Sequence, residues 1–164
     1  MKPRTGKRRK AAMTALATGF LLVLPQVEAY AMEEAEVQEL SEQFGTDYSL
    51  CPELLQAIAC QESSYDETAE SDGCIGLMQI SERWHRDRMA RLKVTDLHDP
   101  EGNMLVAADY LSELFVQYED IGMVLMVYSG DSGADGYAMT GKGLSSYAQQ
   151  IMEQAQRLEM EHGK

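Results

Sequence analysis

Hydrophobic residues recur every three or four positions along most of the chain after residue 32, a spacing typical of helices that bury one face. The pattern predicts helices over residues 33–44, 52–63, 82–91, 100–118, 120–128 and 144–158. Gly45 is expected to end the first helix, because glycine is the commonest helix terminator. No alternation of strands and helices and no internal repeat is visible, so the sequence predicts a mainly α, single-domain protein.

Two segments between these helices are rich in turn-forming residues. Residues 66–76 are polar and include Ser71-Asp72-Gly73, which predicts an irregular loop or a small hairpin. Residues 130–143 contain several glycines and are expected to form a loop.

The amino terminus has the pattern of a secretory signal peptide. A basic run ends at Lys10, an apolar stretch follows over 11–24, and the small-residue pattern Ala29-Tyr30-Ala31 comes next. The apolar stretch is shorter than the roughly 20 residues that a spanning helix needs, so an uncleaved membrane anchor is the less favoured alternative. We therefore expect a signal peptide over 1–31, a domain over 32–164, and an exported, extracytoplasmic protein that contacts the membrane only if the leader stays attached.

The net charge of the chain limits the classes of molecule that it is expected to bind. The whole sequence carries −13, and removal of residues 1–31 leaves eight basic and twenty-six acidic side chains, a formal charge of −18. Such a surface argues against binding to nucleic acid, which requires clustered Lys and Arg.

Three cysteines, Cys51, Cys60 and Cys74, fall after the leader. An oxidising compartment would permit one disulfide, whose pairing the sequence leaves open. Cys51 and Cys60 would lie roughly 13 Å apart on one continuous helix, so any bridge should include Cys74. No histidine stands at metal-ligand spacing with these cysteines, so neither a metal nor another cofactor is expected.

Three short segments carry candidate chemistry. Glu62 closes an otherwise apolar helix, where the negative end of the helix dipole raises the pKa of a carboxyl group; a solvated surface glutamate is the alternative. Gln79 stands between large apolar residues, as a buried amide or a sugar-binding amide would. Tyr128 precedes the glycine-rich loop, although its ring could equally serve only for packing.

The order of these segments resembles the soluble lytic transglycosylase (SLT) family of the lysozyme superfamily, over roughly residues 50–150. The matching stretches are Leu54–Ser63, Ser71–Ile80, Asp99–Leu111 and Leu125–Gly130. Further stretches, Cys51–Leu54, Trp84-His85 and Arg88-Met89, also look like cell-wall lytic domains of Gram-positive bacteria. The resemblance implies a lysozyme-like domain with the loop or hairpin between the catalytic helix and the next one.

The resemblance also implies a reaction. A member of this family would cleave the β-1,4 bond between N-acetylmuramic acid and N-acetylglucosamine in peptidoglycan, with Glu62 as its acid and base, and would leave 1,6-anhydromuramoyl ends. Candidate substrate-binding residues are Ser63, Ser71, Met78, Gln79, Tyr128, Ser129 and Tyr147. Asp99 and Asn103 would be structural, Tyr128 would lie close enough to Glu62 to hydrogen-bond to it, and Tyr147 could equally belong to the core.

Some functional questions stay open at this level. One of Asp66, Glu67, Glu70 and Asp72 could act as a second carboxylate, which would give a hydrolase of goose-type lysozyme character. A catalytically weak glycan-binding assembly factor is the non-enzymatic alternative. Ser129 replaces the asparagine usual in the family, which predicts weaker activity or a changed sugar preference. We expect a monomer whose partners are peptidoglycan strands and, as one option, conjugation or secretion machinery.

Overall fold

The computed structural model describes residues 31–164, which form seven helices and one small antiparallel sheet. The predicted signal peptide lies outside these residues except for Ala31. The elements are α1 (Glu34–Tyr48), α2 (Pro52–Ser63), β1 (Glu70–Ser71), β2 (Cys74–Ile75), β3 (Ile80–Ser81), α3 (Glu82–Leu92), α4 (Pro100–Tyr118), α5 (Ile121–Tyr128), α6 (Ala134–Thr140) and α7 (Ser146–Glu161). The mainly helical architecture is therefore confirmed.

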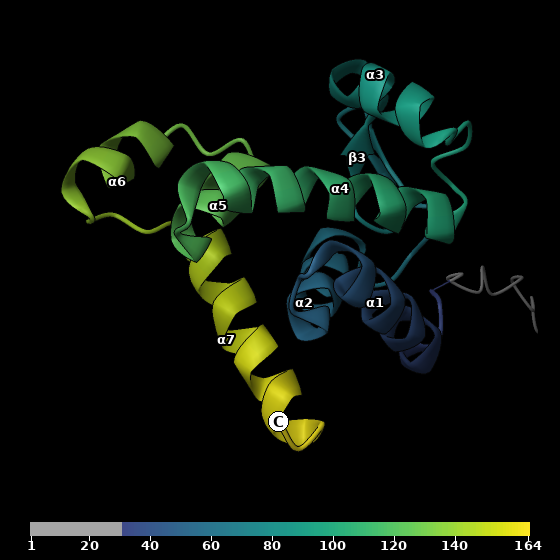
Figure 1. The fold of residues 1–164 in the computed structure, drawn as a ribbon, viewed down its shortest axis with the longest axis horizontal. Coiled ribbons are helices and arrows are strands. Elements are labelled where there is room, and N and C mark those ends of the chain that lie inside the picture. The colour runs from purple at the N-terminus through teal and green to yellow at the C-terminus, as the bar shows by residue number, and fades with distance from the viewer. Residues whose placement is uncertain (1–30) are drawn as a thin grey trace, which may run out of the picture.

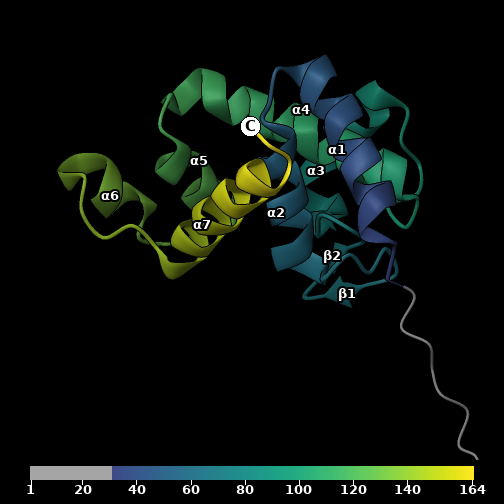
Figure 2. The ribbon, with the colours of Figure 1, turned by 90° about the horizontal axis from the view of Figure 1, so that it is seen from below.

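Helix α2 lies at the centre of the molecule and packs against both α1 and α7. Its residues Leu55 and Ile58 are completely buried, as are Met104 and Leu111 of α4. Helix α4 runs across the molecule, α5 continues from its end, and α7 crosses beside α2 (Figures 1 and 2). Helix α2 is therefore enclosed between the helix that precedes it and α7, which comes much later in the sequence.

Gly45 does not end the first helix, which corrects the sequence prediction. Helix α1 continues to Tyr48 and is closed by Ser49 in a left-handed conformation. Gly45 is instead a point of close approach, because a Cβ there would lie 2.9 Å from the Pro52 side chain and 3.0 Å from the Leu50 carbonyl oxygen. The glycine lets the turn between α1 and α2 fold tightly against the helix.

Both turn-rich segments contain regular secondary structure. Residues 66–76 belong to a three-stranded sheet of order β1-β2-β3, in which Ser71 pairs with Cys74 and Ile75 with Ile80, so the hairpin alternative is confirmed. The prediction of a loop over 130–143 is wrong in part, because this segment includes α6, which stands at the periphery of the fold (Figure 1). Helix α6 buries Ala134, while Gly136 faces open space and so does not disturb the packing.

All three cysteines carry free thiols. The disulfide that the sequence would have allowed is thus absent from the structure. Within residues 31–164, no helix combines the length and the apolar character that crossing a bilayer requires.

Candidate active site

A groove of about 890 Å³ runs past the carboxyl end of α2. Its walls come from the small sheet, from α3 and α4, and from the ends of α5 and α7. Six of the eight predicted site residues line it: Glu62, Ser71, Gln79, Tyr128, Ser129 and Tyr147. The fold thus gathers residues from four separate segments of the sequence into one concave surface.

Glu62 is partly buried in the wall of this groove. Its carboxyl oxygen Oε1 accepts a hydrogen bond from the hydroxyl of Tyr147. Burial raises the pKa of Glu62, and the hydrogen bond from Tyr147 offsets only part of that rise. The structure therefore holds a carboxyl group that retains its proton to a higher pH than an exposed glutamate.

Tyr147 of α7, rather than Tyr128, is the hydrogen-bond partner of Glu62, which corrects the sequence prediction. The hydroxyl of Tyr128 donates to the carbonyl oxygen of Met78 at 2.9 Å and so ties the end of α5 to the loop before β3. Burial, followed by the nearby Glu62, raises the pKa of both tyrosine hydroxyls, so both remain protonated donors.

Met78 and Ser63 do not line the groove, contrary to the prediction that they would contact sugar. The Met78 side chain is completely buried, and its backbone N–H donates to Asn103 at 2.8 Å. The Ser63 hydroxyl donates to the carbonyl oxygens of Leu77 at 2.8 Å and Ala59 at 3.2 Å. Both residues hold the loop against the end of α2 and so support the position of Glu62.

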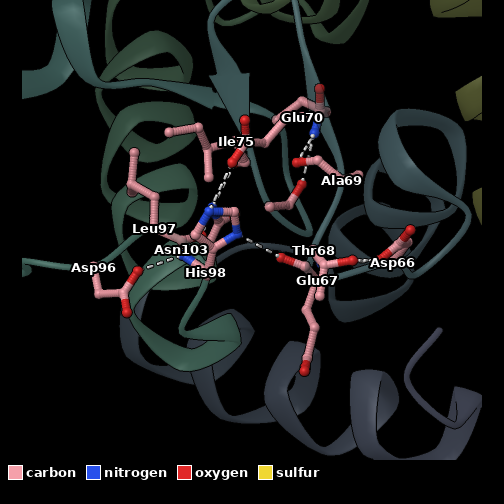
Figure 3. Close-up of polar contacts among 12 residues, drawn as sticks. Asp66, Glu67, Thr68, Ala69, Glu70, Ile75, Asp96, Leu97, His98 and Asn103 are labelled. Atoms are coloured by element: carbon pink, nitrogen blue, oxygen red, sulfur yellow. Dashed lines mark hydrogen bonds and ion pairs between the residues drawn. The ribbon is translucent and has the colours of Figure 1, made fainter. Parts of the chain in front are cut away.

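Asn103, near the start of α4, fixes the loop between β2 and β3. Its buried amide nitrogen donates to the carbonyl oxygens of Ile75 at 2.8 Å and Leu97 at 2.7 Å; the three residues are labelled in Figure 3, where Asn103 lies behind His98. Asp99 caps α4 through the N–H of Gly102 at 3.0 Å. The structural roles predicted for Asn103 and Asp99 are confirmed.

The loop approaches Asn103 so closely that only glycine fits at position 76. A Cβ on Gly76 would lie 2.2 Å from the Leu97 carbonyl oxygen and 2.5 Å from the Asn103 amide, and the residue has a φ of +77°. A side chain there would push the loop, and with it Gln79, away from the groove.

Gln79 adopts a left-handed conformation with φ of +48°. Its amide nitrogen donates to the carbonyl oxygens of Ala69 at 3.1 Å and Gly76 at 3.0 Å. These two bonds fix the amide plane at the edge of the groove and leave the side-chain oxygen as a free acceptor.

Sequence reasoning missed the wall of the groove formed by α3 and α4. Trp84, His85 and Arg88 of α3 and Tyr110 of α4 all line it. The ring of Tyr110 lies 4.7 Å from that of His85 and 5.8 Å from that of Tyr128, measured between centroids. The spacing of residues 84, 85 and 88 on one face of a helix was the signal available in the sequence.

The carboxylates near Glu62 in the sequence have different environments. Asp66 accepts two hydrogen bonds from Thr68, at 2.8 Å from its N–H and at 2.7 Å from its hydroxyl. Glu70 lies 3.0 Å from the ring of His98. Of the four candidates for a second catalytic carboxylate, Asp72 is the one that lines the groove together with Glu62.

A second cluster of acidic and thiol groups lies at the opposite end of α2. Cys51, Glu53 and Glu159 bring their ligand-type atoms within 4.8 Å of one another. Glu53 is already paired there with Lys164 at 2.6 Å and His162 at 2.9 Å, so its charge is neutralised without an ion.

Comparison with known proteins places this geometry in context. A search of curated protein sequences returned no match. Among solved structures, the chain resembles the lytic transglycosylase Slt from Pseudomonas aeruginosa, determined as an inactive mutant, with a TM-score of 0.67 and 18% identity. The likeness covers 77% of this chain but only 24% of that protein, and it confirms the predicted lysozyme-like fold. The family model described as the transglycosylase SLT domain matches residues 39–151, and the chain therefore belongs to the SLT domain family.

Proposed function

We propose that this protein is a peptidoglycan lytic transglycosylase with Glu62 as its catalytic acid and base. The observation that carries the proposal is the setting of Glu62, a partly buried carboxyl group in the wall of a groove, oriented by Tyr147. Neither a lysine nor an arginine forms an ion pair with it among residues 31–164. A carboxyl group in such a place can hold a proton near neutral pH and release it to a substrate.

The hydrogen bond from Tyr147 determines which oxygen of Glu62 can act. Because Oε1 accepts the tyrosine hydroxyl, the proton belongs on the other oxygen, which is free to face the substrate. In the first step, Glu62 gives this proton to the β-1,4 glycosidic oxygen between N-acetylmuramic acid and N-acetylglucosamine, and the bond to the anomeric carbon breaks.

The second step uses the same group in reverse. The Glu62 carboxylate takes the proton of the muramoyl 6-hydroxyl, whose oxygen attacks the anomeric carbon and closes a 1,6-anhydro ring. Glu62 is protonated again at the end, and no water is consumed. A single carboxyl group therefore suffices for both proton transfers.

Polar side chains along the groove would hold the sugar substituents. Ser71 and Ser129 are exposed there, and the free side-chain oxygen of Gln79 can accept a hydrogen bond from an acetamido N–H. The Ser129 hydroxyl donates to the Met126 carbonyl oxygen at 3.1 Å, so this residue offers substrate less than a longer amide would.

Mass spectrometry of digested peptidoglycan tests the proposal. Anhydromuramoyl products are expected, lighter by one water than the reducing-end products of a hydrolase. Glu62→Gln should release no soluble muropeptides, whereas Glu53→Gln, at the other end of the same helix, should release them as the native protein does. Equal release by Glu62→Gln would contradict the assignment of Glu62.

A muramidase that hydrolyses the same bond is the second candidate. The observation that favours it is Asp72, a second carboxylate that lines the groove with Glu62. If Asp72 activates water, native protein should yield reducing ends and Asp72→Asn should abolish the reaction. Under the transglycosylase proposal, Asp72→Asn keeps the anhydro product.

The setting of the activity follows as part of the proposal. Peptidoglycan lies outside the cytoplasm, which agrees with a cleaved signal peptide over residues 1–31. Wall remodelling, or local opening of the wall for a conjugation or secretion apparatus, would suit a small monomeric enzyme of this kind. Amino-terminal sequencing of the exported protein would test cleavage after Ala31.

A further inference from the structure

Trp84, the only tryptophan in the sequence, is strongly exposed at the edge of the groove. It lies in the first turn of α3, and 76% of its surface is open to solvent. The guanidinium group of Arg83 lies 5.1 Å from its ring centroid. Such a cation–π contact favours one orientation of the indole ring, while most of the ring's surface stays open to solvent.

A row of rings leads from the catalytic end of the groove to helix α3, which carries this tryptophan. Tyr128, near Glu62, stacks on Tyr110 with centroids 5.8 Å apart and an interplanar angle of 30°. Tyr110 lies 4.7 Å from His85, the neighbour of Trp84 in α3. Trp84 therefore stands in the α3 wall of the groove, a different wall from the end of α2 that carries Glu62.

The wall that carries this row is held rigidly by Arg88. Its Nε lies 2.7 Å from Asp109, its Nη1 donates to His85 at 3.2 Å, and its guanidinium group stacks on Tyr110 at 4.8 Å. The remaining nitrogen of the guanidinium group, Nη2, pairs with Glu113. The Tyr110 and His85 rings are consequently fixed in the wall, whereas the Trp84 ring is the one presented to solvent.

We propose that Trp84, backed by Arg83, is a stacking platform for a pyranose ring of the bound glycan, at a subsite remote from the bond that is cut. The inference rests on the proposed function, since it assumes that the groove holds a glycan strand. The C–H groups on one face of a pyranose pack against an aromatic face, and a large rigid ring in a groove is a typical site for such contact. Because the platform is remote, only strands long enough to reach it benefit.

The single tryptophan makes the proposal directly measurable. We suggest a fluorescence titration of the Glu62→Gln protein with peptide-free glycan strands prepared from peptidoglycan, fractionated into strands of two and of six disaccharides. The longer strands should shift the emission of Trp84 to shorter wavelength and protect it from acrylamide quenching. The shorter strands should bind through the catalytic end and leave the emission nearly unchanged.

Substitution gives a second readout. In the Glu62→Gln background, Trp84→Ala should weaken calorimetric affinity for the longer strands by about tenfold and Trp84→Phe by less, with little change for the shorter strands. In the active enzyme, Trp84→Ala should raise KM for long strands and leave kcat unchanged, because the platform does not touch the reacting atoms. Met139→Ala, which truncates an equally exposed side chain on α6, serves as the matched control.

The outcomes separate this inference from the proposed function. If native protein releases muropeptides but Trp84→Ala binds and cleaves long strands as well as Met139→Ala does, the platform is wrong and the proposed function stands. If long strands bind by calorimetry without changing the emission of Trp84, the platform is likewise wrong. If native protein neither binds nor cleaves strands of either length, the proposed function fails and the platform with it.

Discussion

Helix α2 carries a glutamate near each end, and the pKa values of the two are shifted in opposite directions. Glu53 in its first turn is almost completely buried and is bonded to Lys164 at 2.6 Å and His162 at 2.9 Å. Glu62 in its last turn is only partly buried and is bonded to the neutral hydroxyl of Tyr147. Burial raises the pKa of both, yet the pKa of Glu53 falls to about 2 and that of Glu62 stays raised.

The difference shows that the partner, rather than burial, decides the direction in which the pKa of a carboxyl group on this helix is shifted. The hydrogen bonds from Lys164 and His162 to Glu53 outweigh the cost of removing its charge from water, which the hydrogen bond from Tyr147 does not do for Glu62. Both partners belong to the carboxyl-terminal segment, Tyr147 to α7 and Lys164 to the end of the chain. The same segment thus lowers the pKa of one glutamate and leaves raised the pKa of the other, which is the proposed proton carrier.

The largest expected effect comes from Glu62→Gln, which removes the proposed proton carrier and keeps the shape of the side chain. Muropeptide release should fall by about 1000-fold, in the range typical for loss of a general acid. The thermal midpoint at pH 7 should be equal to or higher than that of the native protein, because the amide avoids burying a charge. Activity measured together with thermal unfolding checks both parts, and a variant that loses activity by unfolding would contradict the comparison.

Glu53→Gln should give the reverse result, with stability lost and activity kept. Removing the anion that Lys164 and His162 contact should lower the free energy of unfolding by about 2 kcal/mol. The rate of muropeptide release per folded molecule should remain close to the native value. Urea unfolding and activity assays on the same preparations provide the measurement.

The pH dependence of unfolding gives that variant an internal control. The pKa of Glu53 is lowered from 4.5 to about 2, so its contribution to stability is complete above pH 4.5 and disappears as the pH falls toward 2. The stability difference between the native protein and Glu53→Gln should therefore shrink across this window. A difference that stays constant there would show that Glu53 does not act through its charge.

Tyr147→Phe should have an intermediate effect on activity. The hydrogen bond from Tyr147 favours the carboxylate form of Glu62, so its loss should raise the pKa of Glu62 further. Activity that requires protonated Glu62 falls as the pH rises through this pKa. The falling limb of the pH–activity profile should therefore move to higher pH. The loss of orientation should lower kcat by about tenfold. Tyr118→Phe, which removes an exposed hydroxyl on α4, is the control; an unmoved limb would mean that Tyr147 does not act on Glu62.

The smallest effect is expected for Ser129→Asn, which leaves both glutamates and their partners intact. The longer amide would reach into the groove with both a donor and an acceptor, and muropeptide release should rise a few-fold through a lower KM. Initial rates at several peptidoglycan concentrations measure it. No change in KM would show that this position does not contact the substrate.

Much of the fold could be predicted because helical periodicity is a local property. The apolar stripes of α2 and α4, the proline in the first turn of each, and the Asp99 cap all depend on residues within a few positions of one another. The errors arose where glycine was interpreted by propensity alone. Gly45 is required by contact with Pro52, and α6 forms in spite of Gly136, because the helix cost of one glycine is only about 1 kcal/mol.

The candidate site was predicted less completely than the fold. Glu62 and Gln79 stand in recognisable motifs, and both line the groove. Met78 was assigned to the wrong surface, because its motif does not reveal which alternate residues of a tight loop face inward. Trp84 and Tyr110 belong to helices whose mutual placement no local pattern specifies.

The sequence by itself determined the helices, the likeness to the SLT family and the position of a glutamate at the end of an apolar helix, because each depends on neighbouring residues. Only the tertiary structure decided the opposite pKa shifts of Glu53 and Glu62. Their partners lie 111 and 85 positions further along the chain, for Lys164 and Tyr147 respectively. Such contacts exist only after α7 has packed against α2, and the pKa of a carboxyl group follows from the groups that packing brings to it.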